Sequence, residues 1–93
     1  MDLQSYTIPE RFAFDEDTSL KVFLAANQAA SVEIVASNLR KIDSLLMQYL
    51  IAASRAWLLR GLSFEVTEVP GEIGDAMTQL GIHQHSLCWK VAA

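Results

Sequence analysis

The 93-residue chain is long enough for one domain, and its hydrophobic fraction of 52% is sufficient for a core without a metal ion or a disulfide. Its formal net charge of −4 argues against non-specific binding to nucleic acid or to an anionic membrane surface. The single cysteine, Cys88, excludes an internal disulfide and fits a reducing cytoplasm.

Neither the N-terminal segment nor the longest apolar run suggests secretion or membrane insertion. Met1–Ser5 has no basic segment and no apolar segment of the kind that a signal peptide carries. The longest apolar-rich run, Leu45–Leu59, is shorter than the roughly 20 residues that a membrane span requires. We therefore expect a soluble, cytoplasmic protein with a single domain over residues 1–93.

The first segment is divided by Pro9. A short strand is expected either before it, at Tyr6–Ile8, or after it, at Arg11–Phe14, and the pattern leaves both open. The acidic cluster and the threonine in Asp15–Thr18 are typical of a helix start, and apolar residues then recur at helical spacing to about Ala30.

The central segment contains the longest predicted helix. Val32–Ala36 has the composition of a buried strand, and a short polar loop follows it. Asp43 is the expected N-cap of a helix that runs to Arg60, and Gly61 is its expected stop.

The last third continues the alternation of strand and helix. Leu62–Thr67 alternates with a period of two, as a strand does, and Pro70-Gly71 indicates a turn. A short helix over Glu72–Leu80 and a final strand over Leu87–Val91 complete the chain. The order β-α-β-α-β-α-β predicts an α/β fold with a largely parallel sheet and right-handed crossovers.

The long helix carries more apolar residues than one buried face needs. Ser44 and Gln48 lie on its polar side, and Met47, Ile51 and Leu59 lie on or near that side. Either other elements cover these three residues or they form an apolar surface patch, and the sequence leaves both open. Four residues share the face that must pack on the sheet: Leu46, Leu50, Ala53 and Trp57.

The segment Val32–Ser44, with the sequence VEIVASNLRKIDS, resembles the strand–loop–helix signature of STAS domains. These domains occur in anti-sigma-factor antagonists and in the tails of sulfate transporters. The similarity continues through Leu50–Ala53, Leu62–Thr67 and Leu80–Ile82, so it covers about the last two-thirds of the chain. It implies a STAS-like α/β fold, with helices packed on a four- to five-stranded, mostly parallel sheet.

In the antagonist branch of this family, the serine directly after the aspartate is the phosphoryl acceptor. The resemblance therefore implies that Ser44 is phosphorylated by a separate kinase and that the modification controls binding to an anti-sigma factor or a related serine kinase. No cofactor is expected, and a homodimer is left open. The expected partner-binding residues lie in the loop and at the helix start: Asn38, Arg40, Lys41, Asp43, Met47, Gln48 and Ile51.

One departure from the antagonist pattern favours a second function. Antagonists usually follow the Asp-Ser pair with a small residue and glycine, whereas this chain has Leu45 and Leu46. The alternative is a constitutive STAS subunit of a larger complex, such as a phospholipid-transport ATPase or a chemotaxis assembly. In that case Ser44 would only cap the helix.

The remaining reactive residue types do not form a catalytic or metal-binding set. His83 and His85 supply two ligands, whereas a zinc site needs more, and no cysteine pair accompanies them. Cys88 is expected to be buried in the last strand as a small hydrophobe, and Trp57 and Trp89 are expected in the core. Because no nucleophile, base and orienting group come together, we expect a protein that is not an enzyme.

Overall fold

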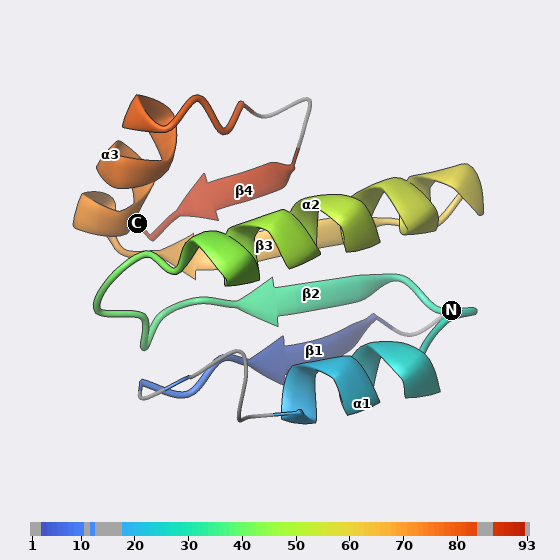
Figure 1. Ribbon diagram of the computed structural model, residues 1–93. Coiled ribbons are helices and arrows are strands. Elements are labelled where there is room, and N and C mark those ends of the chain that lie inside the picture. The colour runs from blue at the N-terminus through green and yellow to red at the C-terminus, as the bar shows by residue number, and fades with distance from the viewer. Residues whose placement is uncertain (1–2, 11, 13–17, 84–86, 93) are drawn as a thin grey trace.

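The computed structural model describes residues 3–10, 12, 18–83 and 87–92 of the chain. Strands and helices alternate along these residues, as the sequence predicts, and form an α/β domain (Figure 1). The strands are β1 Gln4–Thr7, β2 Val32–Val35, β3 Phe64–Val69 and β4 Cys88–Val91, and the helices are α1 Ser19–Ala26, α2 Ser44–Leu59 and α3 Gly71–Gln79.

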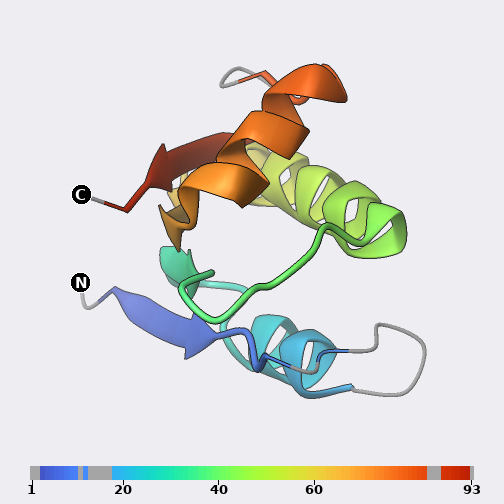
Figure 2. The ribbon, with the colours of Figure 1, turned by 90° about the vertical axis from the view of Figure 1, so that its left-hand side faces the viewer.

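The four strands form one parallel sheet in the order β1-β2-β3-β4. Thr7 aligns with Val35, Val35 aligns with Thr67, and Val66 aligns with Trp89. Each connection between strands moves on to the next strand in the same direction across the sheet. Because such crossovers are right-handed, they place all their helices on the same face of the sheet. In Figure 2 the helices α1, α2 and α3 lie on one face of the sheet and leave the other face uncovered.

The core lies between the sheet and the helices. Val32, Ile34 and Val66 point from the central strands toward α2, and each is at most 2% exposed. Leu46 and Leu50 fill the space from the helix side and are equally buried. The alternation of buried and partly exposed residues along β2 and β3 follows from this one-sided cover.

The uncovered face of the sheet is polar. The Glu33 carboxylate accepts hydrogen bonds from the Ser5 and Thr67 hydroxyls, both at 2.8 Å. These two hydrogen bonds, with a smaller contribution from the Lys90 charge, hold the pKa of Glu33 below its ordinary value. Lys90 itself forms an ion pair with Glu65 at 3.3 Å. This polar network lets an all-parallel sheet expose one face to water.

The expected burial of Cys88 is wrong. The expectation treated the thiol as a small hydrophobe that the last strand buries. In β4 the side chain that faces the helices is Trp89, which is 8% exposed, so its neighbour Cys88 points to the uncovered face and is exposed. The predicted core positions of Trp57 and Trp89 are confirmed.

Helix α1 is shorter than predicted. It ends at Ala26, because the Asn27 side-chain amide donates to the Phe23 carbonyl at 2.8 Å and its backbone amide bonds to the Leu24 carbonyl. The residues of Asp15–Asp17 that were expected to start this helix lie outside the described residues. The first strand is confirmed before Pro9 and begins two residues earlier than expected.

The ends of β2, α2, α3 and β4 agree with the prediction to within one residue, whereas β3 lies two residues beyond the expected Leu62–Thr67. Gly61 and Gly81 adopt positive φ angles of 76° and 79° after α2 and α3, a conformation that glycine accepts without strain. Pro70, expected in a turn, is the N-cap residue of α3. Glu68 has a positive φ of 55° where the register between β3 and β4 shifts, so this β-bulge stores backbone strain near the end of β3.

Across the described ranges, no helix combines the length and the apolar character needed to cross a membrane.

Candidate functional site

The candidate site lies where the chain passes from β2 into α2, at the carboxyl edge of the sheet (Figure 1). Asp43 is confirmed as the N-cap of α2. Its Oδ1 accepts hydrogen bonds from the backbone amides of Leu45 at 2.9 Å and Leu46 at 3.1 Å. Leu46 is 1% exposed and anchors the first turn in the core. The start of α2 is therefore fixed by one carboxylate and one buried leucine.

Ser44 is the first residue of α2 and is exposed. Its hydroxyl has no hydrogen-bond partner among the described residues. Ser44 does not take the capping role that the constitutive-subunit alternative gave it, because the Asp43 carboxylate caps the helix. A phosphate on Ser44 would therefore lie beside two backbone amides that the Asp43 carboxylate already binds.

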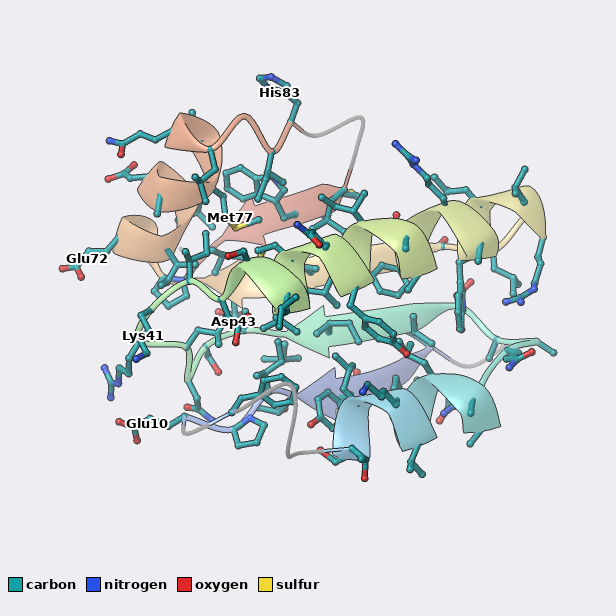
Figure 3. The ribbon with its side chains drawn as sticks, in the orientation of Figure 1. Glu10, Lys41, Asp43, Glu72, Met77 and His83 are labelled. Carbon is teal, nitrogen blue, oxygen red and sulfur yellow. The ribbon has the colours of Figure 1, made fainter. Side chains whose placement is uncertain are left out.

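A cavity of about 310 Å³, which we call the α2-start cavity, opens beside this helix end. Three of the expected partner-binding residues line it, namely Arg40, Lys41 and Asp43. Figure 3 shows Lys41 and Glu10 at the same end of the molecule as Asp43. The complete lining is Glu10, Phe12, Leu39, Arg40, Lys41, Asp43 and Leu46.

Glu10 and Phe12 are site residues that the sequence reasoning missed. Glu10 accepts a hydrogen bond from Arg40 Nε at 3.1 Å, in an exposed ion pair. A signal for this contact was present, because the segments after two adjacent parallel strands meet at the same edge of the sheet. Once β1 is placed beside β2, the segment after β1 must neighbour the loop that holds Arg40 and Lys41.

A second cavity, of about 300 Å³, lies on the other side of the same loop. Arg40 and Leu39 line both cavities, so the loop forms a wall between them. The start of α3 borders this second cavity, and Figure 3 shows Glu72 at that end of the molecule. Its lining is Ser37, Leu39, Arg40, Pro70, Gly71, Glu72 and Ile73.

The remaining expected partner-binding residues divide by burial. Asn38 and Gln48 are exposed but line neither cavity. Ile51 is half-buried and packs against the core. Met47 is 3% exposed, so its expected place on an accessible surface is wrong. The helical wheel put Met47 near the polar side, but its side chain belongs to the buried core cluster.

Histidine and carboxylate side chains do not converge on a metal site in the part of the chain that the structure describes. Figure 3 shows His83 beyond the end of α3, away from Lys41 and Asp43. His85, the other histidine considered from the sequence, lies outside the described residues. The candidate site therefore offers charge, hydrogen bonding and an exposed hydroxyl.

Comparison of the chain with family models, with curated proteins and with solved structures finds no match. The sequential parallel sheet with helices on it is consistent with a STAS-like fold. The function and the family membership that the segment Val32–Ser44 suggests remain predictions.

Proposed function

We propose that the protein is a non-enzymatic interaction module whose binding to a protein partner is controlled by phosphorylation of Ser44. The observation that supports this most strongly is that two neighbouring residues at the start of α2 differ in their roles. Asp43 caps the helix, while the neighbouring Ser44 hydroxyl is exposed and has no structural task. By resemblance to anti-sigma-factor antagonists, the partner is an anti-sigma factor or a related serine kinase.

The modification transfers the γ-phosphoryl group of ATP to Ser44 Oγ. The new O–P bond forms as the bond to ADP breaks, and the hydroxyl proton passes to a base of the kinase. The phosphoserine carries about −1.5 to −2 charges at neutral pH. It lies next to the Asp43 carboxylate, which already holds the amides of Leu45 and Leu46. Repulsion between the two anions weakens the cap and makes the surface negative.

Arg40 and Lys41 determine how much of this charge is neutralised. Both line the α2-start cavity beside Asp43, and Arg40 is engaged by Glu10 at 3.1 Å. A partner that binds the unmodified protein uses these cations together with the exposed Leu45, which is 57% exposed. The phosphate competes for the same cations, so the partner is released.

A matched pair of substitutions tests the switch. Ser44→Asp and Ser44→Asn have almost the same shape and differ in charge. With purified anti-sigma kinases of the same organism, we expect Ser44→Asn to bind within about twofold of the wild type and Ser44→Asp to bind about tenfold more weakly, measured by isothermal titration calorimetry. Equal affinities for the two variants contradict the switch.

A constitutive subunit of a larger complex, such as a phospholipid-transport ATPase or a chemotaxis assembly, is the second candidate. The exposure of Leu45 next to Ser44 favours it, because an apolar side chain at a binding surface suits a permanent interface. This function predicts that Ser44→Asp and Ser44→Asn both remain bound in the complex. Co-purification of the two tagged variants with the complex distinguishes it from the switch.

A further inference from the structure

The α2-start cavity combines an apolar wall with charged side chains. Leu39 is 7% exposed and Leu46 is 1% exposed, and the half-buried Phe12 completes the apolar part of the lining. The other described residues of the lining are charged, namely Glu10, Arg40, Lys41 and Asp43. In Figure 3, Glu10 and Lys41 lie at the outer edge of this end of the molecule. The cavity can therefore bury an apolar group while a charged group beside it stays at the surface.

Three of the four charged side chains already have a partner within the protein. Glu10 accepts a hydrogen bond from Arg40 Nε at 3.1 Å, so these two charges offset each other. The Asp43 carboxylate accepts hydrogen bonds from two backbone amides at the start of α2. Lys41 is exposed, and it forms no ion pair or hydrogen bond with any other residue that the structure describes. Lys41 is thus the charged group of this cavity that is available to an outside molecule.

The size of the cavity suits a single large side chain. Its volume of about 310 Å³ lies at the lower end of the roughly 300–1,000 Å³ that pockets for whole small ligands have. A leucine or phenylalanine side chain from outside would bury its surface against Leu39 and Leu46, as the anchor residues of protein interfaces do. A carboxylate next to that side chain would give the Lys41 ammonium group a partner, so the charge of the cavity favours an acidic occupant.

We infer that the protein partner inserts a large apolar side chain into the α2-start cavity and pairs a neighbouring carboxylate with Lys41. The inference rests on the proposed function for the presence of a protein partner, and it adds the chemistry by which that partner is recognised. Lys41 lies three residues before Ser44, so a phosphate on Ser44 competes with the partner's carboxylate for the ammonium group. Lys41 is then the principal cation through which the phosphate releases the partner.

Two small probes test the chemistry of the cavity without the partner. 4-Phenylbutyrate and 4-phenylbutylamine share an apolar group and carry opposite charges. Titrated into the isotope-labelled full chain, phenylbutyrate is expected to shift the amide signals of Leu39, Lys41 and Leu46. We expect it to bind at least about threefold more tightly than the amine. Equal binding of the two probes, or shifts that lie elsewhere on the molecule, overturns the inference.

Two exposed lysines provide a matched control. Lys41 lines the cavity, whereas Lys90 lies on the uncovered face of the sheet and is paired with Glu65 at 3.3 Å. Lys41→Gln and Lys90→Gln change the net charge of the protein equally. Lys41→Gln should abolish the preference for phenylbutyrate, and Lys90→Gln should leave it within about 1.5-fold of the wild type. The same loss in both variants, or an undiminished preference in Lys41→Gln, contradicts pairing with Lys41.

A double-mutant cycle with the partner tests the link to Ser44. The affinity of the anti-sigma kinases of the same organism is measured for Ser44→Asp and Ser44→Asn, once with Lys41 present and once in a Lys41→Gln background. If the added charge acts by occupying Lys41, the difference of about tenfold between the two Ser44 variants falls to about threefold or less when Lys41 is replaced. A difference that stays tenfold shows that the charge on Ser44 acts through other groups, and it overturns the role of Lys41.

The Ser44 switch and the recognition by Lys41 fail in different measurements. Equal affinities of Ser44→Asp and Ser44→Asn with Lys41 present contradict the switch, and the two probes still decide whether the cavity takes an apolar group with a carboxylate. A tenfold difference between these variants, together with no binding of phenylbutyrate at the cavity, supports the switch and overturns the inference alone. An affinity for the anti-sigma kinases that Lys41→Gln leaves unchanged also overturns it.

Discussion

The two ends of α2 are held in different ways. At its carboxyl end, Trp57 is 4% exposed, its indole N–H donates to the Ala30 carbonyl at 2.8 Å, and its ring meets Phe64 edge-on at 5.8 Å. At its amino end, the cap is the single half-buried Asp43, and the first helical residue, Ser44, is exposed.

This difference separates stability from recognition within one helix. The carboxyl end contributes buried aromatic area and a hydrogen bond that joins α2 to the segment before β2. The amino end contributes a helix cap, which is worth much less than a buried tryptophan. A charge added at Ser44 can therefore change the surface without unfolding the domain.

The largest expected effect comes from removing the anchored end. Trp57→Ala should lower the free energy of unfolding by about 3–5 kcal/mol, because it leaves a cavity and an unpaired Ala30 carbonyl. Trp57→Phe keeps most of the apolar volume and should lose only about 1–2 kcal/mol. Urea denaturation of both variants measures the difference. A loss of the same size in Trp57→Ala and Trp57→Phe contradicts the anchor.

Substitutions at the amino end of α2 should change the free energy of unfolding by no more than the loss of an ordinary helix cap does. Asp43→Ala should cost about 1 kcal/mol, because the amides of Leu45 and Leu46 lose their acceptor, while Asp43→Asn should retain most of the stability. Ser44→Ala should change stability by no more than a few tenths of a kcal/mol, since alanine is a good helix former. Urea denaturation with hydrogen exchange at the Leu45 and Leu46 amides measures this. A cost for Ser44→Ala equal to that of Asp43→Ala would return the capping role to Ser44.

The bulge in β3 offers a smaller effect in the opposite direction. Glu68 has a φ of 55°, which costs a residue other than glycine roughly 1–2 kcal/mol. Glycine removes this strain and loses part of the gain to its greater freedom in the unfolded chain, so Glu68→Gly should stabilise the protein by about 0.5 kcal/mol. Glu68→Ala removes the carboxylate but keeps the strain. Thermal unfolding should therefore rank Glu68→Gly above Glu68→Ala, and the reverse order contradicts strain at this position.

A substitution at Glu33, on the uncovered face of the sheet, should have the smallest effect on the free energy of unfolding, and this effect should depend on pH. Hydrogen bonds from Thr67 and Ser5 lower the pKa of Glu33 below its ordinary value of 4.5. Their stabilisation is fully present above that value and is lost as the pH falls through the lower pKa of the folded state. Glu33→Gln should flatten the dependence of the unfolding free energy on acidic pH, and binding at Ser44 should be unaffected. An unchanged slope in this variant would show that the Glu33 network does not contribute.

Local signals in the sequence predicted the order of elements and the main boundaries. Asp43 acts as a cap and Gly61 acts through a positive φ, each at a single position, so the sequence alone specifies them. The parallel arrangement follows from the alternation of strands and helices, because each crossover returns the chain to the same starting edge.

The features that the sequence did not predict depend on neighbours in space. Met47 belongs to the buried core cluster of the folded domain, whereas a helical wheel describes one helix alone. Cys88 is exposed because the sequential strand order leaves one face of the sheet uncovered. Glu10 and Phe12 join the site through the pairing of β1 with β2, which only the fold specifies.

Intact-mass analysis after incubation with the anti-sigma kinases of the same organism and ATP tests the proposed role of Ser44 most directly. We expect a single phosphoryl group on the wild type and none on Ser44→Ala. Asp43→Asn is a folded control that retains the Ser44 hydroxyl. No added mass in the wild type, or a phosphoryl group that persists in Ser44→Ala, would contradict it.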